Sequence, residues 1–183
     1  LRSLNSTSAK TLAHSMVFDV PGTTRAFDAL LDCFVESDPR TKCRNLTALR
    51  PTEADTLASD VDEKYLNDLI PAIEQVGMPD RPVFVKPREL PLRKLNSRPG
   101  HLAFIHAICH IEFTAINLAL DALIRFRGLP ERYYRDWLRV AQEEAQHFTL
   151  LNEHLGTLGC QYGDLPAHRG LWDVAQRSSH DIV

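Results

Sequence analysis

One long apolar stretch limits what this chain can fold into. Residues 101–155 carry apolar side chains at helical spacing, interrupted once at Arg127-Gly128-Leu129-Pro130. Glycine and proline break helices, and a short connection places two helices side by side in opposite directions. The sequence therefore predicts an antiparallel helical hairpin at the centre of an all-α fold.

The first helix of this hairpin carries an acidic residue among apolar ones. At about 100° per residue, Glu112 lies in the middle of the apolar side. That side consists of Ile105, Ile108, Ala115, Ile116, Ala119 and Leu123. The opposite arc, predicted to face solvent, consists of His106, His110, Thr114, Asn117, Asp121 and Arg125. A carboxylate in an apolar setting needs a cation or strong donors, or it must stay protonated.

The second helix repeats this pattern. Glu144 lies at the centre of its apolar stripe, and His147 lies at the edge of the stripe, three residues later. The stripe consists of Tyr133, Trp137, Val140, Ala141, Phe148, Leu151 and Leu155. The solvated side consists of Glu131, Arg135, Arg139, Gln142, Gln146 and Glu153. Both helices of the hairpin thus place an acid on their apolar side.

The positions of these acids along the hairpin predict that they meet. Glu112 lies about sixteen residues before the turn and Glu144 about fifteen after it, so the rise of about 1.5 Å per residue sets them at one level. Two inward carboxylates at one level repel unless a metal ion or a proton joins them. Glu-x-x-His is also the ligand spacing of bundle di-metal proteins. We therefore predict Glu112, Glu144 and His147 as metal ligands; the alternative is that Glu144 and His147 pair with each other or with arginines in a hydrated core.

The other histidines give weaker signals. His106 and His110 lie one turn apart and could bind a metal as a pair. Their arc points away from Glu112, which favours hydrogen-bonding roles instead. His154 follows His147 by two turns on a similar line and is a candidate for the entrance of the site, whereas His168 has no assigned role.

Composition places the chain among soluble globular proteins. It has 183 residues, of which 44% are hydrophobic and 25% charged, and a net charge of -3. This is the size of one domain, or of one domain with an arm, and the charge is not that of a nucleic-acid-binding surface. The four cysteines form no C-x-x-C pair and indicate free thiols in a reducing compartment, so we expect a cytoplasmic protein. Polar residues interrupt the first hairpin helix too often for a membrane span.

The N-terminal part is predicted to be an arm, residues 1–100, with short helices. Residues 24–36 have helical periodicity and end at Asp38-Pro39, whereas residues 39–61 are polar without a pattern and are predicted to be loop. A further helix is predicted near residues 62–76. Thr11 to Phe18 fit a short helix or a strand equally well.

The rest of the chain frames the hairpin. Residues 78–100 contain several prolines and no helical period, and are predicted to be an extended strap across the bundle. After the hairpin, a loop over 159–170 precedes a third helix that begins at Arg169. Residues 101–183 would form the bundle domain.

Several motifs occur together in an order that points to a known family. The chain resembles a family of uncharacterised bacterial proteins with a ferritin-like fold, catalogued as domain of unknown function 455. The motifs are Lys86-Pro87-Arg88-Glu89-Leu90-Pro91, His106-Ala107-Ile108-Cys109-His110-Ile111-Glu112, Ala115-Ile116-Asn117-Leu118-Ala119-Leu120-Asp121, Val140-Ala141-Gln142-Glu143-Glu144-Ala145-Gln146-His147-Phe148 and Tyr162-Gly163-Asp164-Leu165-Pro166-Ala167-His168.

This resemblance implies a four-helix ferritin-like bundle with a carboxylate-bridged di-iron site. The same ligands could also hold manganese or a mixed pair of metals. It implies Glu112, Glu144 and His147 as the ligands from the first half. Members continue through a third and a fourth helix with a second acidic-His motif. We therefore expect this chain to be truncated within the third bundle helix, with an incomplete site. Pairing of two copies as a homodimer is the other way to complete it.

Three functions fit these features. The first is an O₂-dependent oxidoreductase acting on an unknown small molecule or on RNA, as ferritin-like tRNA hydroxylases do, with Tyr133, Tyr134 or Trp137 tuning or protecting the metal. The second is iron binding or handling without an organic substrate. The third is a helical interaction module whose buried acids are structural.

Overall fold

The computed structural model describes residues 23–51, 75–91 and 94–177. In this part of the chain the regular structure is helical, and β pairing is limited to one isolated bridge. The elements are α2 (Thr23–Val35), α3 (Pro39–Ala48), the short 3-10 helix η1 (Pro87–Glu89), α6 (Arg98–Arg125), α7 (Glu131–Thr157) and α8 (Gly170–Arg177). The predicted all-α helical bundle is confirmed.

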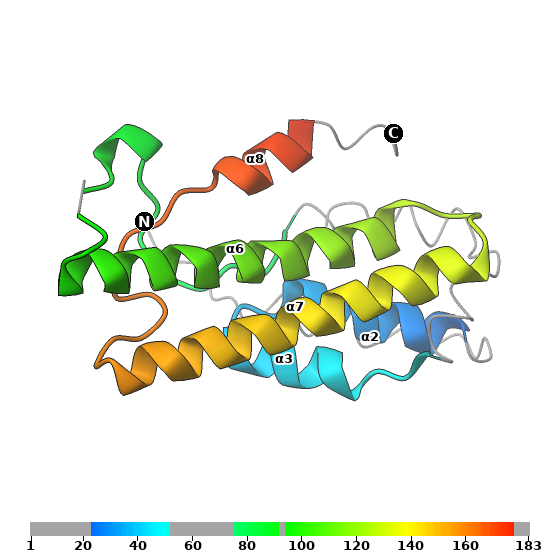
Figure 1. The fold of residues 1–183 in the computed structure, drawn as a ribbon. Coiled ribbons are helices and arrows are strands. Elements are labelled where there is room, and N and C mark those ends of the chain that lie inside the picture. Colours follow the sequence, from blue (N-terminus) through cyan, green and yellow to red (C-terminus); the bar gives the residue numbers. More distant parts are fainter. Residues whose placement is uncertain (1–22, 52–74, 92–93, 178–183) are drawn as a thin grey trace, which may run out of the picture.

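The hairpin of α6 and α7 is the centre of the molecule (Figure 1). α6 begins earlier than predicted because the side chain of Ser97 accepts a hydrogen bond from the Gly100 amide at 3.2 Å and Pro99 suits the first turn. The turn after α6 places Gly128 at φ 69°, a conformation that glycine adopts without strain. The predicted antiparallel hairpin is thus observed.

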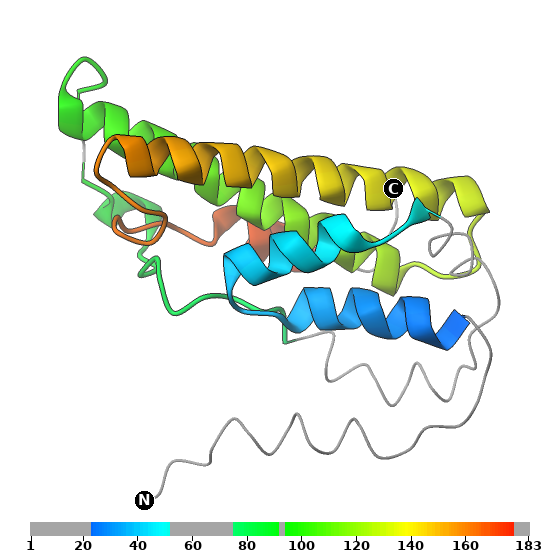
Figure 2. The ribbon, with the colours of Figure 1, turned by 90° about the horizontal axis from the view of Figure 1, so that it is seen from below.

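α2 and α3 form a second layer against this hairpin (Figure 2). α2 contacts α6, and α3 contacts α7. α2 matches the helix predicted at residues 24–36. The loop predicted for residues 39–48 is wrong, because Asp38 starts a new helix there: its Oδ1 accepts a hydrogen bond from the Thr41 amide at 2.8 Å. α3 is mostly polar, but it has a narrow apolar face formed by the buried residues Cys43 and Leu46.

A buried lysine joins the two layers. Lys42 is 0% exposed, and its ammonium donates to the carbonyls of Phe34 at 3.2 Å and Gly77 at 3.0 Å and to the side-chain oxygen of Asn117. Phe34 lies in the last turn of α2 and Asn117 in the middle of α6. Burial lowers the pKa of Lys42 to about 7. One side chain therefore connects α3 to α2 and to α6.

The arc of α6 predicted to face solvent is largely buried, and that prediction is wrong. His106, His110, Thr114 and Asn117 are all buried. These polar groups can be buried because each forms hydrogen bonds in the interior. His106 Nε2 accepts from the Gly163 amide at 3.0 Å, and both ring nitrogens of His110 have partners. The hydrogen-bonding roles favoured for these two histidines are confirmed.

The strap and the loop between α7 and α8 (residues 158–169, the C-terminal loop) lie along α6. Val85 N donates to Ala167 O at 2.9 Å, and Ala167 N donates to Val83 O at 3.1 Å, which forms the isolated bridge between Phe84 and Ala167. The described residues 78–91 of the strap are extended apart from η1, as predicted. Residues 94–97 form a turn, and the prediction is wrong for residues 98–100, which form the first turn of α6. The predictions for residues 11–18 and 62–74 lie outside the described residues.

α6 is also long and apolar enough to cross a membrane by length and composition. Within the fold, 61% of its most apolar window is buried. A helix in the core of a fold has the same apolar composition, because buried positions are mostly apolar.

Candidate metal centre

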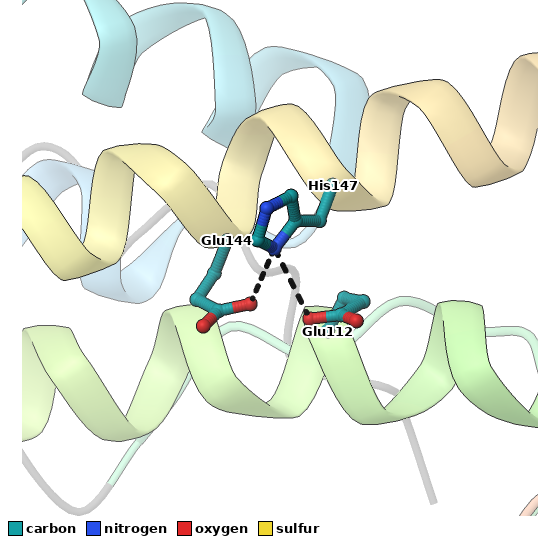
Figure 3. A group of neighbouring side chains, drawn as sticks. All are labelled: Glu112, Glu144 and His147. Carbon is teal, nitrogen blue, oxygen red and sulfur yellow. Dashed lines mark hydrogen bonds and ion pairs between the residues drawn. The ribbon is translucent and has the colours of Figure 1, made fainter.

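Three predicted ligand residues converge on one face of the hairpin (Figure 3). Glu112 comes from α6, whereas Glu144 and His147 come from α7. Each offers one ligand atom, and these atoms all lie within 4.8 Å of one another. His147 Nδ1 lies 3.2 Å from Glu144 Oε2 and 3.8 Å from Glu112 Oε2.

The local structure explains this convergence. α6 and α7 run antiparallel from a short turn, so positions at equal distance from the turn face each other. On α7, residues three apart lie on the same side of the helix, which brings His147 over Glu144. The predicted meeting of the two acids at one level of the hairpin is therefore what the structure shows.

Glu144 lies beside the buried face of α7, not at its centre as predicted. The buried residues of α7 are Tyr134, Leu138, Ala141, Ala145, Phe148 and Leu155. Tyr133, Trp137 and Leu151 are only half-buried, and Val140 is exposed. The buried face is displaced because α3 packs on the other flank of α7. Glu144 and its neighbours therefore line the open edge of the hairpin.

The three side chains differ in how far they reach water. The side chains of Glu112 and Glu144 are 20% and 22% exposed, and that of His147 is 55% exposed. The pKa of Glu112 is raised to about 7, mainly by burial and then by the hydrogen bond to Glu144 and its negative charge, against a lowering effect of His147. The two carboxylates thus resist simultaneous ionisation unless a positive charge joins them.

This donor set suits a transition metal. Two carboxylate oxygens and one imidazole nitrogen are ligands for iron, manganese or zinc. A metal bound at about 2.1 Å from each ligand separates neighbouring ligand atoms by roughly 3 to 3.5 Å. The separations of 3.2 and 3.8 Å around His147 Nδ1 come close to that spacing without a backbone change.

Some apolar side chains of the hairpin are exposed. Phe104 and Ile111 of α6 are 50% and 52% exposed, and Val140 of α7 is 36% exposed. Among the described residues, Glu112, Glu144 and His147 are the one group of His, Cys, Asp and Glu arranged to hold a metal ion. The described part of the chain therefore provides ligands for a single ion.

The aromatic residues considered as tuning groups support the hairpin turn. The Tyr133 hydroxyl donates to the Ala122 carbonyl at 3.2 Å. The Tyr134 hydroxyl donates to the Phe126 carbonyl at 3.1 Å and accepts from the Leu129 amide at 3.2 Å. Their hydroxyl groups thus bind backbone at the end of the hairpin.

Sequence reasoning missed two polar clusters. Lys42 contacts Asn117, and His110 contacts the partly buried Tyr162. Lys42, His110 and Asn117 are buried, although Lys42 was predicted to lie in a loop and the other two on the solvated arc of a helix. Each cluster joins residues far apart in the chain, so no local pattern shows it. The one available signal was the short polar run that holds Lys42, which also carries a cap residue, Asp38, and a proline at the first helical position.

Fold and site together define an all-α bundle protein with a carboxylate–histidine cluster between two antiparallel helices. Residues 35–183 match the family described as "Protein of unknown function (DUF455)", and the chain belongs to this family. It is 44% identical over 156 residues to an uncharacterized protein of Haemophilus influenzae, covering 80% of this chain and 53% of that protein. The chain thus spans about half the length of this curated relative. No solved structure matches the chain.

Proposed function

We propose that this chain is the first half of a ferritin-like metalloprotein in which Glu112, Glu144 and His147 bind iron. The observation that supports the proposal is the convergence of three ligand atoms within 4.8 Å, from two antiparallel helices. The Glu-x-x-His spacing on α7, with one further Glu on the neighbouring helix, is the half-site of ferritin-like di-metal bundles. The raised pKa of Glu112 fits a site that is stabilised when a cation replaces the shared proton.

The activity we propose is an O₂-dependent oxidation in the cytoplasm. A bound iron pair would supply redox chemistry with O₂, and the protein would supply binding and orientation. Glu112 and Glu144 would carry the negative charge that holds the metal, and the half-exposed His147 would lie at the solvent side of the site. The substrate would be a small organic molecule or RNA.

The curated relative is about twice as long as the segment it shares with this chain. We propose that further ligands come from a part of the protein beyond the present sequence, and that pairing of two copies is the second way to supply them.

A second candidate function is iron handling without an organic substrate. The exposure of His147 favours it, because an ion can reach this ligand directly from water. Oxygen uptake separates the two functions: an oxidase with its substrate consumes O₂ catalytically, whereas a storage or transfer site consumes it only in proportion to the iron added.

The test is metal analysis of protein purified from iron-supplemented cells. We expect iron in the wild-type protein and its loss in Glu144→Ala. Glu143→Ala is the matched control, because Glu143 has the same side chain on the same helix and pairs instead with Arg139 at 2.9 Å. Equal metal in the three proteins would overturn the proposal.

A further inference from the structure

A pocket lies on α6 away from the metal cluster. Its volume is about 610 Å³, within the range of roughly 300–1,000 Å³ for small-molecule sites. α6 forms its floor, and the strap forms one wall with Leu90 and Leu95. Leu165 of the loop before α8 and Leu171 of α8 itself form the other wall. Figure 1 shows η1 and α8 on the side of α6 away from α7. Separate segments of the chain thus line one space that is partly open to solvent.

The described lining of this pocket carries no full charge. Its described lining residues include no Asp, Glu, Lys or Arg, and their polar side chains are His110, Thr114 and His168. An ion moved from water into this space would lose hydration without gaining an opposite charge. The pocket therefore suits an uncharged, largely apolar molecule.

Two of the three polar side chains are already engaged. The Thr114 hydroxyl donates to the His110 carbonyl at 2.8 Å. The Nε2 of His110 lies 3.0 Å from the His168 carbonyl, an acceptor, and its Nδ1 lies 2.9 Å from the Tyr162 hydroxyl, so both ring nitrogens already have partners. Neither residue has a side-chain donor left for a ligand.

Unlike His110 and Thr114, His168 has a side-chain donor that no described residue already uses. Its Nδ1 accepts a hydrogen bond from the Gly170 amide at 3.1 Å, and this bond selects the tautomer that carries its proton on Nε2. No described residue forms a hydrogen bond with that Nε2. Gly170 holds the ring, and His110 holds the backbone carbonyl of the same residue. His168 lines the pocket and therefore brings to it a ring donor that has no described partner.

We propose that this pocket is a binding site for an uncharged, largely apolar small molecule whose carbonyl or ether oxygen accepts a hydrogen bond from His168 Nε2–H. The site is distinct from the metal cluster: none of Glu112, Glu144 and His147 lines it. It therefore stands whether or not the chain binds iron.

The first test uses equilibrium dialysis of the full 183-residue chain, in the presence of a chelator, with two probes of the same shape. 2-Acetylnaphthalene carries a carbonyl acceptor, and 2-isopropenylnaphthalene replaces that oxygen with a methylene group. One neutral hydrogen bond predicts roughly two- to tenfold tighter binding of the ketone. The preference should disappear in His168→Leu and persist in His168→Gln, which retains a donor. Equal binding of both probes to the wild-type chain would overturn the proposal.

The second test fills the pocket. Ala107 is exposed on α6 and lines the pocket, so Ala107→Phe adds bulk there without entering the core. Ala48→Phe is the matched control, since Ala48 is exposed on α3 and lies outside the pocket. We expect Ala107→Phe to abolish saturable ketone binding, and Ala48→Phe and Glu144→Ala to bind like wild type, with circular dichroism confirming that each variant folds. Unchanged binding in Ala107→Phe, tighter binding of 2-naphthoate than of the ketone, or no saturable binding to wild type would each refute the site.

Discussion

His147 Nδ1 on α7 lies 3.8 Å from Glu112 Oε2 on α6, across the interface between the two hairpin helices. The two residues are 35 positions apart and meet because the turn between the helices is short. A metal ion bound to both would cross-link α6 and α7. This link between binding and folding leads to the first prediction.

Metal binding should raise the stability of the wild-type chain. An ion that binds the folded hairpin and not the unfolded chain stabilises it by about 2.7 kcal/mol at one hundred times its dissociation constant. Thermal unfolding with increasing Fe²⁺ under anaerobic conditions measures this effect. We expect the midpoint to rise for wild type and for Glu143→Ala, and to stay constant for Glu144→Ala. A rise of equal size in Glu144→Ala would place the binding site elsewhere.

The metal-free protein should lose stability as the pH rises from about 4.5 to about 7. The folded pKa of Glu112 is raised above its ordinary value of 4.5 to about 7, so the folded state holds a proton that the unfolded state has released. Its stabilising contribution is complete below the unfolded pKa and is lost as the pH passes through the folded pKa. Chemical denaturation across this range should show a smaller decline in Glu112→Gln than in wild type. An identical pH dependence in both proteins would contradict the assignment.

Metal affinity should change in the opposite direction over the same pH range. The ion competes with the proton that Glu112 retains because its pKa is raised. Binding should therefore tighten as the pH rises toward 7, and Glu112→Gln, which cannot ionise, should bind weakly at every pH. Isothermal titration at several pH values checks this, and pH-independent affinity in wild type would count against it.

Loss of Lys42 should destabilise the fold. Lys42→Met leaves the carbonyls of Phe34 and Gly77 and the side chain of Asn117 without their buried donor, at an expected cost of about 2–4 kcal/mol. Because Lys42 and Asn117 share one contact, adding Asn117→Leu should cost less than it does in the wild-type background. Urea denaturation of the four proteins of this cycle measures the coupling. Strictly additive effects would show that the contact contributes little.

The isolated chain should bind at most one metal ion weakly and should tend to associate. Its described residues supply one cluster of three ligands, and the hairpin also leaves Phe104, Ile111 and Val140 exposed. Exposed apolar surface of this kind favours contact with another protein surface. Light scattering during a metal titration tests both parts. A stable monomer that holds two ions tightly would refute the expectation.

The local chemistry of the hairpin could be predicted from the sequence alone. Helical periodicity located α6 and α7, and the distance of Glu112 and Glu144 from the turn placed them at one level, because the rise per residue of a helix is constant. The same reasoning placed His147 beside Glu144. These relations depend on short-range geometry, which the order of residues determines.

The tertiary structure decided which sides of the helices are buried. The arc with His110 and Asn117 looked solvated, yet the C-terminal loop and Lys42 of α3 cover it and supply its hydrogen bonds. Conversely, apolar Val140 is exposed because α3 packs on another flank of α7. The physical reason is that a polar side chain is buried only when a partner, often distant in sequence, satisfies it. The identity of that partner depends on how the helices are placed in space, and the periodicity of a single helix does not contain it.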